Sequence, residues 1–179
     1  MGTRTVVLLR HGQYEAEGIG SLTALGRAQA RAAARYLLGC VPVDVIWAST
    51  LVRARETAEI VSAELALPVK HTRTLREGMY SKIEGYEVPP SERREDRARA
   101  NSVYEKFFRT SRVDKTDLVV CHGNLIRYLV CKALHAPTGR WIRMTTHHCS
   151  LTRIVVRDSG AVRVVSYNET AHLPRRLVT

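Results

Sequence analysis

The stretch VVLLRHG at residues 6–12 is an apolar run that ends on a histidine and a glycine, and LVVCHG at residues 118–123 repeats this pattern. Each run has the length and composition of a strand that is buried on both faces. Parallel strands present their carboxyl ends at one edge of a sheet, which is where open α/β folds bind ligands. The sequence therefore predicts an active site in which His11 and His122 face one pocket.

The composition fits a single domain over residues 1–179. The chain has 179 residues, of which 45% are hydrophobic, and this is enough to bury a full core. It contains no apolar stretch long enough to cross a bilayer and no signal-peptide pattern, so we expect no membrane segment. Four cysteines without a CxxC motif indicate reduced thiols and a reducing compartment.

Arginine supplies most of the positive charge. The formal net charge is +11 at pH 7, and a guanidinium group binds phosphate or carboxylate through two parallel hydrogen bonds. The charge therefore favours phosphorylated ligands. Nucleic-acid binding is the alternative, but the arginines are scattered and aromatic residues make up only 6% of the chain. Because no recognition motif is present either, we expect no nucleic-acid partner.

Strands and helices alternate through most of the chain. After the first strand, the pattern predicts helices at 23–38, 53–65, 92–109 and 124–134, and strands at 43–48, 69–72, 118–121, 150–157 and 162–167. Thr23 is the expected N-cap of the first helix. Residues 77–91 contain two glycines and two prolines, which predicts a loop over the sheet edge. The order of elements predicts a three-layer α/β/α sandwich around a mostly parallel sheet.

Four motifs, in the same order, resemble those of the histidine phosphatase superfamily, also called the phosphoglycerate mutase-like family. They lie at residues 9–12, 22–30, 49–58 and 121–123 and so span nearly the whole chain. Within that superfamily, further segments resemble the branch of mitochondrial Ser/Thr protein phosphatases, at residues 75–78, 122–128 and 150–152. The resemblance implies a phosphoglycerate mutase-like fold and a phosphatase that works through a phosphohistidine.

The residue types support phosphoryl transfer without the resemblance. A neutral imidazole is a competent nucleophile, and forming a phosphohistidine divides hydrolysis into two easier steps, so His11 is the expected nucleophile. Arg10, Arg53 and a protonated His122 would surround the phosphoryl oxygens and stabilise the charge that develops on them. Such a site requires no metal and no cofactor.

Glu77 is the expected general acid. A serine or threonine alkoxide is strongly basic and must be protonated as it leaves, and the same carboxyl group can then activate water against the phosphohistidine. Glu77 begins the loop at 77–91, where Glu84 is a second carboxylate. Asn124 and the backbone near Ser150 are further candidate phosphate ligands.

Three other features have simpler interpretations. His147 and His148 suggest a metal site, but neighbouring residues of a strand point to opposite faces, and no further ligand has a suitable spacing. Cys121 lies in an apolar run, which indicates an inert, buried thiol rather than a nucleophile. Residues 93–97 carry mixed charges and predict a solvated helix face.

The resemblance also implies residue roles and a substrate class. It makes Glu77 the proton donor and places Arg10, His11, Arg53 and His122 in the phosphate pocket. The segment after Glu77 lacks the long insertion of the mutases, so we expect hydrolysis of phosphoserine or phosphothreonine in a phosphoprotein or phosphopeptide. The alternatives are a small-molecule phosphatase of the same superfamily and a weakly active phosphoprotein-binding scaffold. A homodimer and a cytoplasmic or mitochondria-associated location are compatible with the resemblance.

Overall fold

The computed structural model describes residues 2–82 and 87–179. Within these residues the centre is a six-stranded sheet in the order β3-β2-β4-β1-β5-β6. The strands are β1 (Arg4–Arg10), β2 (Val45–Ser49), β3 (Val69–Thr72), β4 (Lys115–Cys121), β5 (Leu151–Val156) and β6 (Val162–Glu169). The first four are parallel, and β5 and β6 add an antiparallel hairpin beside β1. The predicted hairpin and mostly parallel sheet are confirmed.

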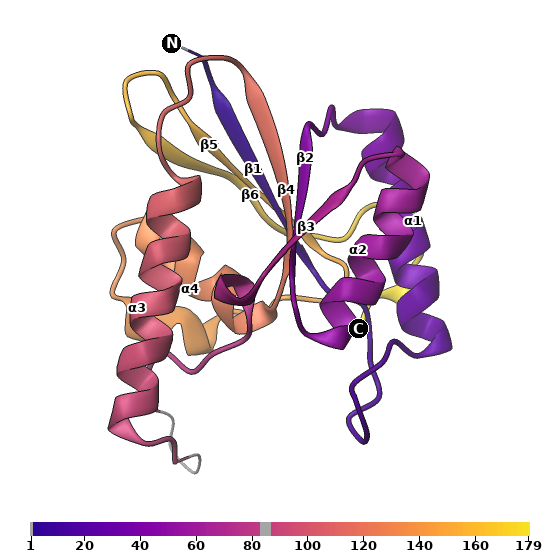
Figure 1. The fold of residues 1–179 in the computed structure, drawn as a ribbon, viewed down its shortest axis with the longest axis horizontal. Coiled ribbons are helices and arrows are strands. Elements are labelled where there is room, and N and C mark those ends of the chain that lie inside the picture. The colour runs from indigo at the N-terminus through magenta and orange to yellow at the C-terminus, as the bar shows by residue number, and fades with distance from the viewer. Residues whose placement is uncertain (1, 83–86) are drawn as a thin grey trace.

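In the described part of the chain, two α-helices cover each face of the sheet (Figure 1). The helices are α1 (Ala24–Cys40), α2 (Val52–Leu65), α3 (Pro90–Phe107) and α4 (Gly123–Ala133), with short 3-10 turns at Arg73–Leu75, Thr138–Arg143 and Arg175–Leu177. Helices α1 and α2 lie on one face, and α3 and α4 lie on the other. The predicted three-layer sandwich is therefore confirmed. Among the described residues, no helix combines the length and apolar character that crossing a membrane requires.

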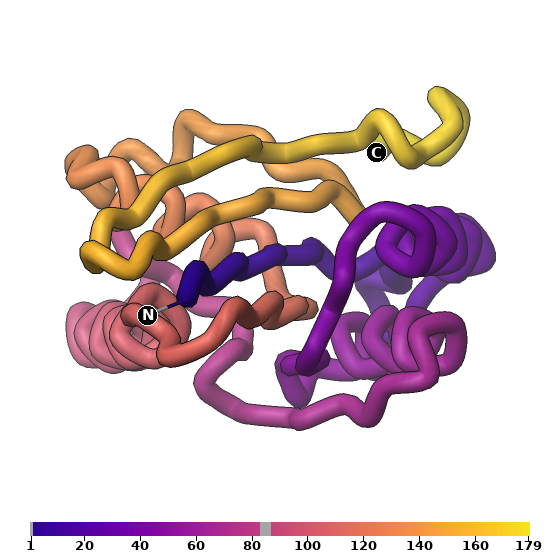
Figure 2. Tube along the Cα trace, turned by 90° about the horizontal axis from the view of Figure 1, so that it is seen from above, coloured from indigo at the N-terminus to yellow at the C-terminus, as the bar shows by residue number. Residues whose placement is uncertain are grey.

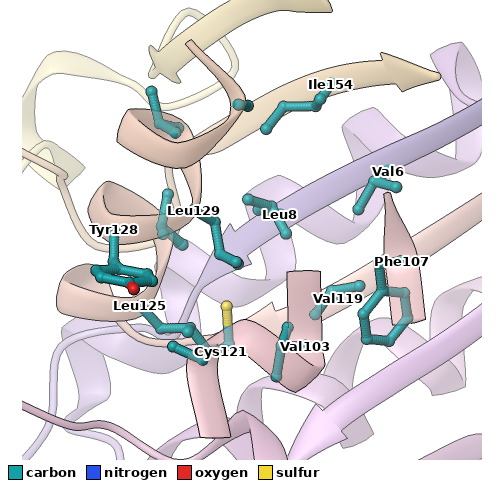
Figure 3. Packing of buried hydrophobic residues seen from close by; sticks show 14 of the residues in the cluster. Val6, Leu8, Val103, Phe107, Val119, Cys121, Leu125, Tyr128, Leu129 and Ile154 are labelled. Carbon is teal, nitrogen blue, oxygen red and sulfur yellow. The ribbon is translucent and has the colours of Figure 1, made fainter. Parts of the chain in front are cut away.

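The central strands bury side chains on both faces. In β1, Val6 and Leu8 belong to the core beneath α3 and α4 (Figure 3), whereas Val7 and Leu9 belong to the core beneath α1 and α2. The neighbouring strand β4 alternates between the two cores in the same way. This two-sided burial explains the uninterrupted apolar runs of the sequence.

The helix boundaries follow local sequence signals. Thr23 is the N-cap of α1, as predicted, because its side-chain oxygen accepts a hydrogen bond from the Gly26 N–H. Helix α3 begins at Pro90 rather than at the predicted residue 92, since proline fits the first helical turn, where its missing N–H is not needed. Helix α2 ends as predicted, and Ala66 follows it in the left-handed conformation.

The C-terminal segment crosses back to α1 (Figure 2). There the buried Gln29 amide donates to the Leu177 carbonyl at 2.7 Å and to Thr179 Oγ1 at 2.9 Å. Its Oε1 accepts the Gln13 N–H at 2.8 Å. One amide of α1 therefore connects the C-terminal residues with the loop that follows β1.

Leu8→Ala should destabilise the fold by about 2–5 kcal/mol, because it removes buried methyl groups and leaves a cavity between β1 and the helices α3 and α4. Val165→Ala, at a residue that is 59% exposed, is the control and should change the free energy of unfolding by less than about 0.5 kcal/mol. Urea unfolding followed by circular dichroism measures both variants. Equal effects would contradict the packing described for β1.

Candidate active site

Parallel pairing brings the two histidines together. Arg10 and Cys121 are partners at the ends of β1 and β4, and the next N–H, that of His11, donates to the Cys121 carbonyl at 3.0 Å. The rings of His11 and His122 follow, with their centroids 5.1 Å apart. Both residues are buried. The structure thus places both at the carboxyl ends of the central strands.

Hydrogen bonds determine the tautomer of His11. Its Nδ1 lies 2.8 Å from the Gly12 carbonyl, which can only accept, so Nδ1 carries the proton. Nε2 is then the basic nitrogen, and it accepts a 3.1 Å hydrogen bond from Arg53 Nε. Burial, reinforced by the neighbouring His122, lowers the pKa of His11 well below its ordinary value. His11 is therefore neutral at pH 7 and offers the Nε2 lone pair that a nucleophile needs.

Two glycines allow the loop after β1 to lie against α1. A Cβ on Gly12 would stand 2.5 Å from the Gly26 carbonyl oxygen, and a Cβ on Gly26 would stand 1.9 Å from the Gln13 carbonyl oxygen. The Gly12 N–H also donates to Thr57 Oγ1 of α2 at 3.0 Å. The glycines of the first two motifs therefore hold the His11 loop against both helices.

Ser49 orients His122. Ser49 Oγ accepts the Leu51 N–H at 3.3 Å, so its hydroxyl proton can point at His122 Nε2, which lies 2.8 Å away. The imidazole proton then resides on Nδ1, which lies 4.0 Å from a Glu77 carboxylate oxygen. Burial, followed by the charge of Arg53, lowers the pKa of His122 well below its ordinary value. This environment favours a neutral His122 ring that donates through Nδ1. The sequence analysis expects a protonated ring at this position, and the burial of His122 opposes that expectation.

Arg53 reaches the site from the first turn of α2. Its Nε donates to His11, and its guanidinium carbon lies 4.5 Å from the centre of the Tyr14 ring, which is a cation–π distance. The Tyr14 ring meets the His11 ring edge-on, with centroids 5.2 Å apart. Tyr14 is therefore a site residue that the sequence reasoning missed, because it lies in an irregular loop with no periodic signal.

Arg10 is held by the segment that precedes β5. Its Nη1 donates to the Thr146 carbonyl, and its Nη2 donates to His148 Nε2 at 3.0 Å. Because arginine only donates, His148 accepts at Nε2, and its Nδ1 donates to Thr179 Oγ1 at 3.0 Å. The second histidine of the adjacent pair therefore orients Arg10 toward the site.

Glu77 lies opposite the histidines. Its Oε1 accepts the Asn124 N–H at 3.1 Å. Burial raises the pKa of Glu77 from 4.5 to about 7, although Arg53 and Arg10 pull it in the opposite direction. A carboxyl group with this pKa keeps a large protonated fraction at neutral pH, as a general acid requires. Asn124, which the sequence suggests as a phosphate ligand, contacts Glu77 through its backbone N–H. Glu84, the second carboxylate of the predicted loop, lies outside the described residues.

Two charged side chains of α3, Asp96 and Arg99, hold the backbone at Glu77 and Met79, on both sides of Gly78, and we call this pair the α3 clamp. Asp96 accepts the Met79 N–H at 2.6 Å, and Arg99 donates to the Glu77 carbonyl at 3.0 Å while pairing with Asp96 at 2.5 Å. A Cβ on Gly78 would lie 2.8 Å from the Asp96 carboxyl carbon. Asp96 is only 6% exposed, so the solvated helix face expected from the sequence is wrong at this residue.

Two remaining predictions concern Cys121 and Ser150. Burial raises the pKa of the Cys121 thiol far above its ordinary value, in agreement with the predicted inert thiol. The Ser150 N–H donates to the His147 carbonyl at 3.1 Å, so this backbone donor is already used within a turn. Ser150 therefore supports the segment that holds Arg10 instead of offering its N–H to a phosphate.

The sequence matches a known family along most of its length. A family model described as the histidine phosphatase superfamily, branch 1, matches residues 6–104 and 87–170, which include His11, Glu77 and His122. The chain belongs to this superfamily. The expected phosphoglycerate mutase-like fold is confirmed by two solved histidine phosphatase-fold structures that cover nearly all of the chain.

One relative and two structures illustrate this membership. The histidine phosphatase chain is 37% identical to the mitochondrial serine/threonine-protein phosphatase Pgam5 of Caenorhabditis elegans, over 96% of this chain and 65% of that protein. A phosphoglycerate mutase from Plasmodium falciparum is 30% identical with a TM-score of 0.70, covering 98% of this chain and 96% of its own. A mycobacterial glucosyl-3-phosphoglycerate phosphatase shares the fold, with a TM-score of 0.72 at 24% identity, covering 94% and 100%.

These comparisons confirm the sequence resemblance to the mitochondrial Ser/Thr phosphatase branch. They also define its extent, because the chain spans 65% of the length of the C. elegans relative.

Asp96→Asn should loosen the backbone beside Glu77, since it weakens a charge-assisted hydrogen bond to the Met79 N–H. A hydrogen bond to a charged group contributes about 1.5–3 kcal/mol, so its loss should reduce the protection of the Met79 amide from hydrogen exchange roughly tenfold or more. Nuclear magnetic resonance measures the exchange, with Asp158→Asn in the exposed β5–β6 turn as the control. Unchanged protection of Met79 in Asp96→Asn would show that the α3 clamp does not hold this segment.

Proposed function

We propose that this histidine phosphatase hydrolyses phosphoserine and phosphothreonine in proteins through a phosphohistidine on His11. The observation that carries the proposal is the neutral His11 whose Nε2 lone pair lies among Arg53, His122 and Glu77. Together these residues supply a nucleophile, cationic and neutral donors, and an acid. The relative's name supports the substrate class, because that protein is a mitochondrial serine/threonine-protein phosphatase.

In the first step, the Nε2 lone pair of His11 attacks phosphorus, and the bond from phosphorus to the seryl or threonyl oxygen breaks. Glu77 gives its proton to that oxygen, so the alcohol leaves neutral. In the second step, the Glu77 carboxylate takes a proton from water as the water oxygen attacks the phosphohistidine. Inorganic phosphate leaves, and both His11 and Glu77 return to their starting states.

The remaining site residues stabilise charge. Arg10 and Arg53 provide guanidinium donors for the phosphoryl oxygens, and His122 adds the Nδ1 proton that has no partner among the described residues. These donors, the nucleophile and the acid fill each role in the reaction, so the proposed mechanism uses neither a metal nor a cofactor.

A cavity of about 270 Å³ adjoins Glu77 and Asn124. Its lining combines catalytic, apolar and acidic residues: Glu77, Gly78, Met79, Val88, Glu92, Asp96 and Asn124. The net charge of +11 of the whole chain attracts an acidic phosphopeptide at long range. The proposed partner is therefore a phosphoprotein. The name of the C. elegans relative also supports a mitochondrial association.

Two alternatives have different consequences. A small-molecule phosphatase is suggested by the shared fold of the glucosyl-3-phosphoglycerate phosphatase. A phosphoprotein-binding scaffold would bind phosphopeptides without turnover, although it would not need a carboxyl group with a pKa of about 7 beside a neutral imidazole.

His11→Ala should abolish turnover and leave the fold intact, because it removes the nucleophile beyond the end of β1 and leaves the apolar core of the strand unchanged. Rapid quenching with a radiolabelled phosphate ester should trap an acid-labile, base-stable label on the wild type and none on His11→Ala. His71→Ala, at an exposed histidine of β3, is the control. Ordinary turnover by His11→Ala would refute the covalent mechanism.

Glu77→Gln should reduce kcat/KM for a phosphothreonine peptide by about 10²–10⁴-fold, because the alkoxide must be protonated as it leaves. Hydrolysis of p-nitrophenyl phosphate should suffer far less, since p-nitrophenolate is a good leaving group. With a Glu77 pKa of about 7, the protonated acid is lost as pH rises, so wild-type kcat/KM for the peptide should fall above about pH 7. Glu77→Gln should lack this decline. Equal losses on both substrates would exclude Glu77 as the acid.

A substrate panel separates the protein and small-molecule alternatives. Phosphoserine and phosphothreonine peptides with acidic neighbours should show higher kcat/KM than fructose phosphates, phosphoglycerates and nucleoside monophosphates. Added salt should reduce this preference, because it screens the attraction to the net positive charge of the protein. A sugar or nucleoside phosphate hydrolysed at least about a hundredfold better than every peptide would overturn the substrate assignment, a factor equivalent to roughly 2.7 kcal/mol.

A further inference from the structure

Three potential metal ligands converge in the site. Ligand atoms of His11, Glu77 and His122 lie within 4.8 Å of one another, and His122 Nδ1 lies 4.0 Å from a Glu77 oxygen. Two imidazole nitrogens and one carboxylate oxygen are a donor set typical of zinc with a further position for another ligand. Zinc bonds of ~2.0–2.2 Å place tetrahedral ligand atoms ~3.4 Å apart, so the three side chains need to close by roughly 1 Å. Glu77, whose side chain is 29% exposed, has the most room to supply this movement.

The far nitrogens of both imidazoles already have the partners that metal-bound histidines need. A histidine that binds a metal usually donates its other N–H to a carbonyl, carboxylate or water, which fixes the ring orientation. His11 donates its Nδ1–H to the Gly12 carbonyl at 2.8 Å. His122 Nε2 lies 2.8 Å from Ser49 Oγ, which can accept its N–H once the imidazole proton moves from Nδ1 to Nε2. Both ligand nitrogens can therefore present lone pairs to one ion.

An independent observation is the unsatisfied nitrogen of His122. Its Nδ1 is fully buried and has no hydrogen-bond partner among the described residues, while the ring is aimed toward Glu77. Buried polar atoms without partners are uncommon, and each calls for an explanation such as a catalytic role, a water molecule or an ion. In the proposed reaction, a phosphoryl oxygen accepts a hydrogen bond from this Nδ1–H. Once the proton has moved to Nε2, the Nδ1 lone pair can bind a metal ion instead.

Two arginines oppose a cation in this position. Arg53 occupies the lone pair of His11 Nε2 at 3.1 Å and must release it. The Tyr14 ring, 4.5 Å from the guanidinium carbon, retains Arg53 beside the site when that hydrogen bond breaks. Because the ion and the phosphoryl group need the same Nε2 lone pair, they cannot occupy the site together.

We propose that His11, Glu77 and His122 bind one Zn²⁺ ion, and that this ion inhibits the phosphatase by occupying its nucleophile and its acid. The inhibition rests on the proposed function, whereas binding of the ion does not.

Cobalt tests the binding directly. Co²⁺ substitutes for zinc, and it absorbs visible light when it has four or five ligands. Titration of the purified wild type should give a saturating spectrum with one ion per chain, and Zn²⁺ should abolish it. Vanadate should compete with Co²⁺, since both need the lone pair of His11. Absence of a saturable spectrum, or binding unaffected by vanadate, would overturn the proposal without bearing on catalysis.

Substitutions test the ligand assignment. Glu77→Gln and His122→Gln should each weaken Co²⁺ binding at least about tenfold, and Ser49→Ala should weaken it by about 10–100-fold through loss of ring orientation. His147→Gln is the matched control, because its histidine belongs to the adjacent pair and lies outside the cluster. Circular dichroism melting verifies the fold of each variant. Loss of binding in His147→Gln with retention in Glu77→Gln would assign the metal to the other histidine pair and refute this site.

Kinetics test the inhibition. Zn²⁺ should raise KM for p-nitrophenyl phosphate without changing kcat, and EDTA should restore the original rate. EDTA alone should leave the metal-free enzyme fully active. Loss of activity with EDTA that one divalent ion restores would show an essential metal and would overturn the inhibitory role. If no phosphate ester is hydrolysed, the proposed function fails while the cobalt titration still decides the binding.

Discussion

The parallel register between β1 and β4 is the constraint on which the site depends. It pairs Arg10 with Cys121, so the two following histidines leave the sheet side by side. Since side chains alternate between faces, a shift of one residue would move every apolar side chain of a strand into the opposite core. Two helix layers, each with its own apolar cluster against these strands, therefore keep the histidines in place. Stability and catalytic geometry thus come from the same packing.

The two charged halves of the site have separate supports. Arg10 is braced from the antiparallel side of the sheet through His148, which also contacts Thr179. Glu77 is braced from α4 by the Asn124 N–H and from α3 by the α3 clamp. The distance between the Arg10 guanidinium and the Glu77 carboxyl group is therefore set by the whole fold, and the local sequence around either residue does not determine it.

Sequence reasoning succeeds where a residue carries a positional signal. Arg10 ends an apolar strand, His11 and His122 each follow one, and Arg53 lies in the first turn of a helix, so their convergence could be predicted from topology. Ser49 and Tyr14 gain their roles only through contacts with side chains brought near by folding. The same limit explains other differences. A charged helix residue gives the same sequence pattern whether it is buried or exposed, so the burial of Asp96 could not be predicted. The sequence also does not show the burial that favours a neutral His122. The short 3-10 segments escaped prediction because one or two turns leave no periodic pattern.

In the metal-free site, the hydrogen bonds from His11 Nδ1 to the Gly12 carbonyl and from Ser49 to His122 Nε2 place both imidazole protons on Nδ1. Neither ring then has to exchange a proton with water during the reaction. In the proposed mechanism, the Glu77 carboxyl group carries the proton that moves to the leaving alcohol and is regained from water. The chemistry thus becomes a one-proton process, whose signature is a rate that falls linearly with the fraction of deuterium in the solvent.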